Sequence, residues 1–302
     1  MLFSILIANY NNGHFFYDCF QSIVNQTYAN WEVIIVDDAS TDDSVAVIQD
    51  LIKDDNRFKL FQNTKNRGCG YSKHRCATLA HGEVLGFLDS DDALYPQAIT
   101  VMIDAHQLNI NAAIITSKYE FVDLEMNFTK HSLYGSNIPK GKSYLTYGNG
   151  ALTHFATFKN DKYKQSGGIN PIMKRAVDQD LYYILEEQGS HVFLEKVLYC
   201  YRVHQNSISN NENLFKAEYW HFYAMLNAYK RRKKNQIEID NFSKKHINEY
   251  ASNYFLGRFE RLKHTNKKGA QFYFLYKAFI TNPFHRFTFK IKSLIVLILG
   301  RI

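Results

Sequence analysis

The sequence is poor in the features that mark several classes of protein. Four prolines and fifteen glycines in 302 residues exclude a collagen-like, linker-like or low-complexity chain. Four cysteines show neither a CxxC pair nor a Cys/His spacing typical of zinc sites, so we expect reduced thiols and a cytoplasmic location. The first residues lack the basic leader of a signal peptide. The longest purely apolar run, Leu294–Leu299, is far shorter than the ~20 residues of a membrane-spanning helix.

Charge is distributed unevenly along the chain. Residues 1–215 carry 18 Lys and Arg against 24 Asp and Glu, whereas residues 216–302 carry 18 against 5. This pattern predicts two domains: a globular domain over 1–215 and a basic, aromatic-rich helical extension over 216–302. An extension of this charge indicates an anionic partner, either lipid headgroups or nucleic acid.

The first 120 residues alternate between short apolar runs and segments of helical periodicity. Five apolar runs predict strands, at residues 3–8, 31–36, 58–61, 84–88 and 112–116. A helix is expected over roughly 71–80, and Ser40 and Asp43 have the spacing of a capping box for the helix after the second strand. Such alternation is typical of an α/β fold with a mostly parallel sheet flanked by helices.

Polar or acidic clusters follow three of the predicted strands, at Asn9–Asn11, Asp37–Asp38 and Asp89–Asp92. Because ligands bind at the carboxyl ends of strands in such sheets, we expect these clusters to meet at one site. Carboxylates held together repel one another, and a divalent cation at Asp89-x-Asp91 would relieve that repulsion. The first strand is followed by neither GxGxxG nor a Walker A loop, which argues against an NAD dehydrogenase or a P-loop ATPase.

Several sequence blocks follow one another in a fixed order over residues 1–210. The earlier blocks are SILIANYN at 4–11, QTY at 26–28, WEVIIVDDASTD at 31–42, NRG at 66–68, GE at 82–83 and FLDSDD at 87–92. The later blocks are GG at 167–168, VDQD at 177–180 and LYCYRVHQNSIS at 198–209. In this order the blocks resemble the family 2 glycosyltransferases of GT-A fold. The resemblance implies a Rossmann-like catalytic domain over 1–215 that uses a nucleotide-sugar donor, as in bacterial surface-polysaccharide assembly.

The resemblance also implies which residues would bind the donor. Tyr10 and the backbone near Ala8 would bracket the base, commonly uracil, with a packing aromatic as the less favoured role of Tyr10. Asp38 would accept a hydrogen bond from the base, and Asp89 would contact the ribose or a metal. Lys73 stands where the family usually has an arginine, which keeps the charge but loses bidentate phosphate geometry.

The same resemblance implies a metal site and a catalytic base. Asp91, with Asp89, would bind Mn²⁺ or Mg²⁺, and His204 would either add a metal or phosphate contact or be a structural histidine. Asp178 would take the proton from the acceptor hydroxyl, as inverting transfer requires. Val177 stands where an acidic residue usually precedes this base, so Asp180 is the alternative base.

We therefore expect a metal-dependent, inverting glycosyltransferase that moves a sugar from a nucleotide-diphosphate donor, in the first place a UDP-sugar, to a glycan or lipid-linked acceptor in polysaccharide biosynthesis. A sugar nucleotidyltransferase is the alternative, although the glycine-rich basic loop that it needs is missing. A nucleic-acid-binding module would use the basic extension but would leave the acidic site unexplained.

The end of the chain mixes apolar and basic residues. Over residues 284–302, phenylalanine, isoleucine and leucine interleave with Arg286, Lys290, Lys292 and Arg301. This composition favours peripheral attachment to an anionic membrane surface, at the inner face of the membrane. Docking onto the catalytic domain and pairing with a second copy are the competing explanations, and the oligomeric state stays open.

Overall fold

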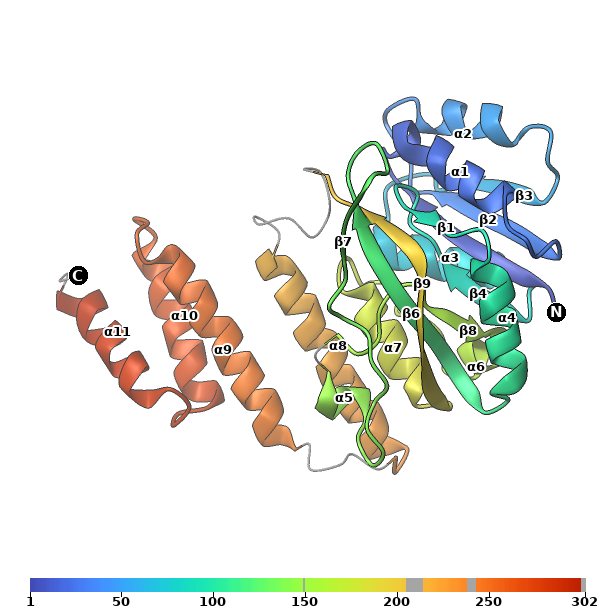
Figure 1. Ribbon diagram of the computed structural model, residues 1–302. Coiled ribbons are helices and arrows are strands. Elements are labelled where there is room, and N and C mark those ends of the chain that lie inside the picture. Colours follow the sequence, from blue (N-terminus) through green and yellow to red (C-terminus); the bar gives the residue numbers. More distant parts are fainter. Residues whose placement is uncertain (149, 205–213, 238–242, 300–302) are drawn as a thin grey trace. The chain divides into compact units, whose positions relative to one another are not determined.

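The computed structural model describes residues 1–148, 150–204, 214–237 and 243–299. The chain divides into two compact units, Met1–Ser207 and Ile208–Ile302, which are coloured from blue to yellow and from yellow to red in Figure 1. All four cysteines are free thiols. In the described part of the chain, no helix is both long enough and apolar enough to cross a membrane.

Four parallel strands form one half of the sheet in the first unit, in the order β3 (Phe58–Gln62), β2 (Trp31–Asp37), β1 (Phe3–Asn9) and β4 (Val84–Phe87). Nearly all residues of β1 and all of β2 are buried, because this part of the sheet is covered on both faces. Each of these strands was predicted within a residue or two of its observed bounds. Their carboxyl ends lie along one edge, where the polar clusters begin.

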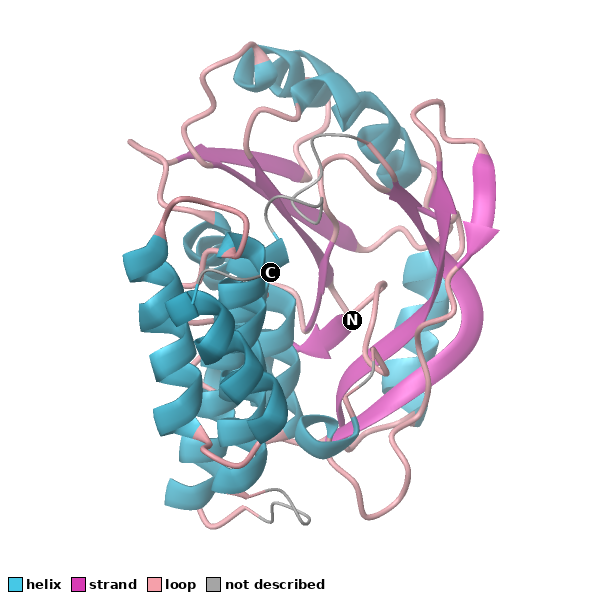
Figure 2. Cartoon of the chain, turned by 90° about the vertical axis from the view of Figure 1, so that its left-hand side faces the viewer, coloured by secondary structure: helices cyan, strands magenta, loops and turns pink. Residues whose placement is uncertain are grey.

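The other half of the sheet contains both parallel and antiparallel pairs (Figure 2). Together the two halves have nine strands among the described residues. The strands of this other half are β5 (Ala93–Leu94), β6 (Ala112–Val122), β7 (Phe128–His131), β8 (Thr157–Lys159) and β9 (Ser190–Arg202). β6 pairs parallel with β9 and antiparallel with β7 and β8, and β8 joins this half to β4. β6 continues six residues beyond the predicted end at Thr116, to Val122.

Helices flank the sheet on both faces. Phe3, Ile5 and Ile7 of β1 share one buried cluster with α1 (Phe16–Val24) and α4 (Ala98–Leu108). α3 (Cys69–Leu79) packs on β1 and β2 outside that cluster. The remaining helices of this unit are η1 (Gly13–Phe15), α2 (Ser44–Ile52), α5 (Tyr144–Tyr147), α6 (Asn160–Gln165) and α7 (Val177–Glu186).

The predicted capping box before α2 is wrong. The helix begins at Ser44, and the Ser40 hydroxyl is used elsewhere: it donates to Asp37 Oδ2 at 2.5 Å and accepts from the Asn11 amide at 2.9 Å. Ser40 therefore joins the ends of β1 and β2 instead of capping α2.

The second unit is helical, as its sequence predicts. Its helices are α8 (Leu214–Lys234), α9 (Lys244–Leu262), α10 (Lys268–Thr281) and α11 (Phe287–Leu299). A small core of Leu256, Phe259, Leu275 and Ala278 joins α9 to α10, and Phe289, Leu294 and Leu297 of α11 pack against it.

Candidate active site

Two aspartates at the end of β2 are held by the chain itself. Asp37 is fully buried and accepts from Asn9 Nδ2 at 2.8 Å, which ties β1 to β2. Asp38 is 4% exposed and accepts from Asn63 Nδ2 at 2.7 Å and from the amides of Arg67 and Gly68 at 2.8 and 2.7 Å. Asp38 thus orders the loop that leads into α3.

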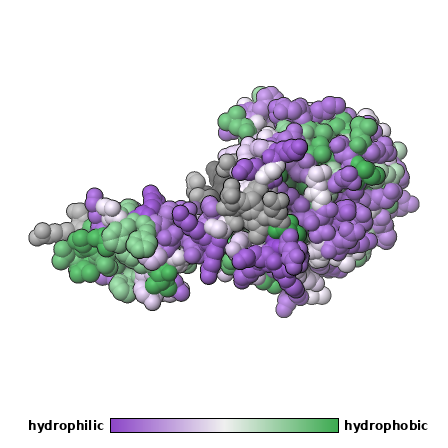
Figure 3. Space-filling view, turned by 90° about the horizontal axis from the view of Figure 1, so that it is seen from below, coloured by the Kyte–Doolittle hydropathy of each residue, from purple (hydrophilic) through white to green (hydrophobic). Residues whose placement is uncertain are grey.

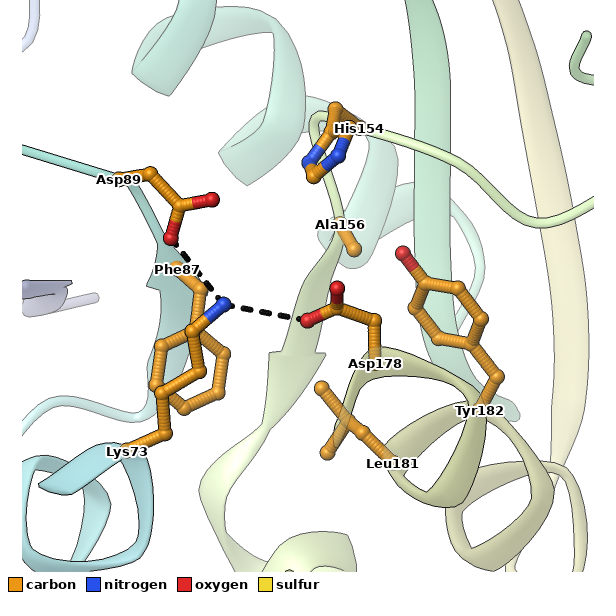
Figure 4. Close-up of a pocket in the computed structure, with 8 residues that line it drawn as sticks. All are labelled: Lys73, Phe87, Asp89, His154, Ala156, Asp178, Leu181 and Tyr182. Atoms are coloured by element: carbon orange, nitrogen blue, oxygen red, sulfur yellow. Dashed lines mark hydrogen bonds and ion pairs between the residues drawn. The ribbon is translucent and has the colours of Figure 1, made fainter. Parts of the chain in front are cut away.

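Lys73 connects two carboxylates that come from distant parts of the chain (Figure 4). Its Nζ lies 3.1 Å from Asp89 Oδ1, just after β4, and 3.1 Å from Asp178 Oδ1, at the start of α7. Burial by itself would lower the pKa of Lys73, but Asp178 and Asp89 raise it well above its usual value. The side chain is therefore a buried ammonium between two carboxylates.

These three residues line one pocket together with five others that the sequence did not single out: Phe87, His154, Ala156, Leu181 and Tyr182. Figure 4 shows Phe87 and Lys73 on one side of Asp178 and Tyr182 on the other. The ring of His154 stacks on Tyr199 at 4.9 Å, and burial lowers its pKa, so it is a neutral imidazole near pH 7. A lone histidine and scattered aromatics give no spacing signal, so their position depends on the tertiary fold.

Asp178 is the more accessible of the two candidate bases. Loss of solvent tends to raise its pKa, but the charge of Lys73 and the hydrogen bond from Lys73 outweigh this and lower it, so the carboxylate is ionised at neutral pH. Its side chain stays 40% exposed, in the first turn of α7, where the helix dipole also favours an anion. Asp180 is 2% exposed, and its Oδ2 accepts the Asn170 amide at 3.1 Å, away from the pocket lining.

The three aspartates of the turn after β4, Asp89, Asp91 and Asp92, have different partners. Asp92 is buried, accepts from Tyr199 Oη at 2.6 Å and from the Arg202 amide at 2.8 Å, and so anchors β9. Asp91 Oδ2 lies 2.8 Å from His204 Nε2. Burial, followed by repulsion from Asp89, raises the pKa of Asp91.

A divalent cation fits the chemistry of this turn. Carboxylate oxygens with an imidazole nitrogen suit Mn²⁺ or Mg²⁺. Burial contributes most to the raised pKa of Asp91, and a cation would relieve the repulsion from Asp89 that adds to it. Among the described residues, no three His, Cys, Asp or Glu side chains converge on one point, so a bound ion would need further oxygen ligands from its substrate.

Ala8 and Tyr10 lie at the end of β1. Ala8 pairs with Val36 in the parallel ladder, and Tyr10 follows the strand with its side chain 44% exposed. Tyr10 lies outside the buried cluster of the sheet.

Sequence comparison identifies a family and several relatives of this chain. Residues 4–170 match the sequence model described as "Glycosyl transferase family 2". A chondroitin synthase of Escherichia coli is 30% identical over 227 residues, which cover 71% of this chain and 32% of that protein. The chain thus spans about a third of this curated relative. A second Escherichia coli relative, "UDP-Glc:alpha-D-GlcNAc-diphosphoundecaprenol beta-1,3-glucosyltransferase WfgD", is 27% identical over 70% of this chain and 81% of its own length.

Structural comparison gives the same fold. A crystal structure of S. aureus TarS 1-349 in complex with UDP superposes with a TM-score of 0.64 at 18% sequence identity, covering 94% of this chain and 81% of that one. A likeness at this identity concerns the fold alone. It agrees with the predicted GT-A architecture and with its helical C-terminal region.

Proposed function

Because the chain belongs to glycosyl transferase family 2, and is therefore a glycosyltransferase, we propose that it moves a sugar from a UDP-linked donor to a hydroxyl of a glycan or lipid-linked acceptor, with inversion at the anomeric carbon. The observation that carries this proposal is the Lys73 bridge. It joins Asp89, at the strand edge where the donor would bind, to Asp178, the candidate base, within one pocket. The group proposed to contact the donor and the group proposed to accept the proton thus lie in the same pocket.

Asp178 is the proposed base. Its ionised, partly exposed carboxylate would accept the proton of the acceptor hydroxyl as that oxygen attacks the anomeric carbon. Lys73 holds Asp178 in place and keeps it ionised. His154 and Tyr182, which line the same pocket, would border the transferred sugar.

On the donor side, Tyr10 and the backbone at Ala8 would bracket the base, and Asp38 would accept a hydrogen bond from it. Asp38 has room for one, because a carboxylate offers about four acceptor positions and three are used by the chain. Asp91, Asp89 and His204 would hold Mn²⁺ or Mg²⁺. When bound, the metal would neutralise charge on the departing diphosphate.

The proposed setting is polysaccharide biosynthesis at the cytoplasmic face of a membrane, with attachment through residues 284–302. The names of two relatives support it: one is a chondroitin synthase and one acts on a diphosphoundecaprenol-linked sugar. Eight basic and no acidic residues over 263–302 support a negatively charged surface as the partner of this end of the chain.

Thermal unfolding with UDP, GDP and dTDP, each with and without manganese, tests the donor site. A nucleotide at about 100 times its dissociation constant should stabilise the protein by about 2.7 kcal/mol. We expect UDP to raise the unfolding temperature only when manganese is present. Asp91→Ala should remove the manganese-dependent part, whereas Asp161→Ala, at an exposed carboxylate on α6, should leave it unchanged. No shift with any nucleotide would contradict the donor assignment.

A further inference from the structure

The second unit exposes apolar side chains along α10. Of twenty large apolar side chains that are exposed among the described residues, nine lie between Phe272 and Leu299. Phe272, Tyr276 and Ile280 recur at every fourth residue of α10 and are 56%, 52% and 53% exposed. Because residues four apart lie on the same side of a helix, α10 carries an apolar stripe that its own unit does not cover.

The neighbouring helix and the loop before it also expose apolar side chains. Phe284, in the loop before α11, is 86% exposed, and Ile295 and Ile298 of α11 are also exposed. Figure 3 shows hydrophobic side chains gathered over this part of the second unit. We call Phe272, Tyr276, Ile280, Phe284, Ile295 and Ile298 the apolar surface of α10 and α11.

Packing on the inner side fixes which residues face outward. Lys290 of α11 is fully buried, and its Nζ donates to the carbonyl oxygens of Ala278 at 2.8 Å and Asn282 at 2.5 Å, at the carboxyl end of α10. A cation at this position satisfies the last carbonyls of a helix and complements its dipole. The exposed apolar residues therefore belong to a fixed helix pair and not to a frayed end.

Charge indicates what would cover this surface. Residues 263–302 contain eight Lys and Arg and no Asp or Glu. Arg286 and Lys292 are exposed, and Lys277 lies over the Tyr273 ring at 5.6 Å. A two-fold contact between copies through this surface would set like charges against each other. Apolar side chains beside unopposed basic ones instead match an anionic bilayer interface, and α11, with 13 residues, is too short to cross it.

We propose that the apolar surface of α10 and α11 inserts into the headgroup region of an anionic bilayer, with Lys277, Arg286 and Lys292 contacting anionic lipid headgroups. The proposal adds α10 to the segment 284–302 and makes its stripe the main apolar contact. It does not depend on the assignment of the base or the metal, because none of the candidate site residues lies on α10 or α11.

Vesicle flotation of the full chain tests the apolar contact. The protein should bind vesicles of phosphatidylcholine mixed with phosphatidylglycerol far better than phosphatidylcholine alone. The triple variant Phe272→Ser/Tyr276→Ser/Ile280→Ser should lose about a hundredfold in partitioning, because three large side chains no longer enter the interface. The matched control Leu108→Ser/Ile110→Ser changes side chains of the catalytic unit that are 84% and 73% exposed and should bind as the unchanged protein does.

A charge variant tests the electrostatic contact separately. Arg286→Gln/Lys292→Gln should lose about thirtyfold on anionic vesicles, which corresponds to about 1 kcal/mol for each basic residue. Lys140→Gln/Lys142→Gln, at exposed lysines of the catalytic unit, should have no effect. Loss in the charge variant together with full binding of the triple variant would mean adsorption without insertion and would overturn the proposal.

A probe variant keeps the test valid if the triple variant does not fold. In Ile280→Trp, the indole should shift its emission to shorter wavelength and be quenched by brominated lipid on anionic vesicles, and Ile110→Trp should show neither. Failure of the unchanged protein to bind anionic vesicles would overturn the proposal. So would a dimer in solution that the Ile280→Trp substitution disrupts, since a second copy would then cover the surface.

Discussion

In the unit Met1–Ser207 buried charges meet opposite charges, whereas the sequence of the unit Ile208–Ile302 carries far more basic than acidic residues. Lys73 bridges Asp89 and Asp178, and Arg202, 3% exposed, pairs with Asp18 at 2.5 Å. In the second unit, the buried Lys290 donates hydrogen bonds to two backbone carbonyls. The final 40 residues contain no acid that could pair with their eight basic side chains.

The apolar side chains show the same contrast. The first unit buries its largest side chains between sheet and helices. In the second unit, a cluster of four buried residues joins α9 to α10, and the apolar stripe of α10 stays exposed. The paired buried charges of the first unit surround an internal pocket. Exposed basic and apolar side chains, as in the second unit, are typical of a surface that binds another molecule or a membrane.

The largest expected effect separates catalysis in the first unit from binding by the second. Asp178→Asn removes the proposed proton acceptor and should lower turnover by about 10²–10⁴, the usual contribution of general base catalysis. UDP-induced thermal stabilisation and vesicle binding should be retained. Release of UDP from a panel of UDP-sugars, with and without candidate glycan acceptors, measures the change.

Asp180→Asn is the matched control for that variant. Its carboxylate accepts the Asn170 amide in a buried position, so the substitution should lower the unfolding temperature but leave turnover measurable. If Asp180→Asn abolished turnover in a folded protein while Asp178→Asn did not, Asp180 would be the base.

A smaller effect tests how the first unit positions its charged pair. Gly70 donates its amide to the Met173 carbonyl at 2.9 Å, and a Cβ on Gly70 would lie 2.2 Å from that oxygen. Gly70→Ala should therefore separate α3, which carries Lys73, from the segment before α7, which carries Asp178. We expect a loss of about 3 kcal/mol in unfolding free energy, at the upper end for overpacking.

Hydrogen exchange resolved by peptide locates that loss. Protection should fall in the peptides of α3 and α7, and those of α9 should be unchanged. Equal loss of protection throughout both units would contradict the view that each folds around its own core.

The parallel half of the sheet could be predicted because its signals are local. β1 and β2 are continuous apolar runs that end at polar residues, and burial on both faces makes such runs easy to recognise. β9 is different: its 13 residues mix buried and exposed positions irregularly, and its partner β6 lies about 70 residues away. Sequence periodicity predicts neither the pairing of β6 with β9 nor the register shifts between them.

The site was predictable in part for the same reason. Carboxylates at strand ends stand out in the sequence, and the family resemblance distinguishes a glycosyltransferase from the nucleotidyltransferase and nucleic-acid-binding alternatives. The partner of each carboxylate was not evident, because Lys73, Asp89 and Asp178 are brought together by three separate elements. His154 reaches the pocket from a segment that no motif marks, and Tyr182 lies on α7 just beyond the VDQD block.

The smallest expected effect is a gain in unfolding free energy in the second unit, opposite in sign to the loss expected for Gly70→Ala. Gly257 lies inside α9, and beyond the adjacent helix backbone a Cβ added there would meet no atom within 4 Å. Gly257→Ala should therefore stabilise the protein by about 0.5–1 kcal/mol, because alanine loses less backbone entropy in a helix than glycine does. Peptide-resolved hydrogen exchange in α9, measured without lipid, should show the gain, and Gly70→Ala is its counterpart of opposite sign. A destabilised Gly257→Ala variant would mean that another protein surface already packs on α9 in solution, and the second unit would then be less open than its exposed charges and apolar stripes indicate.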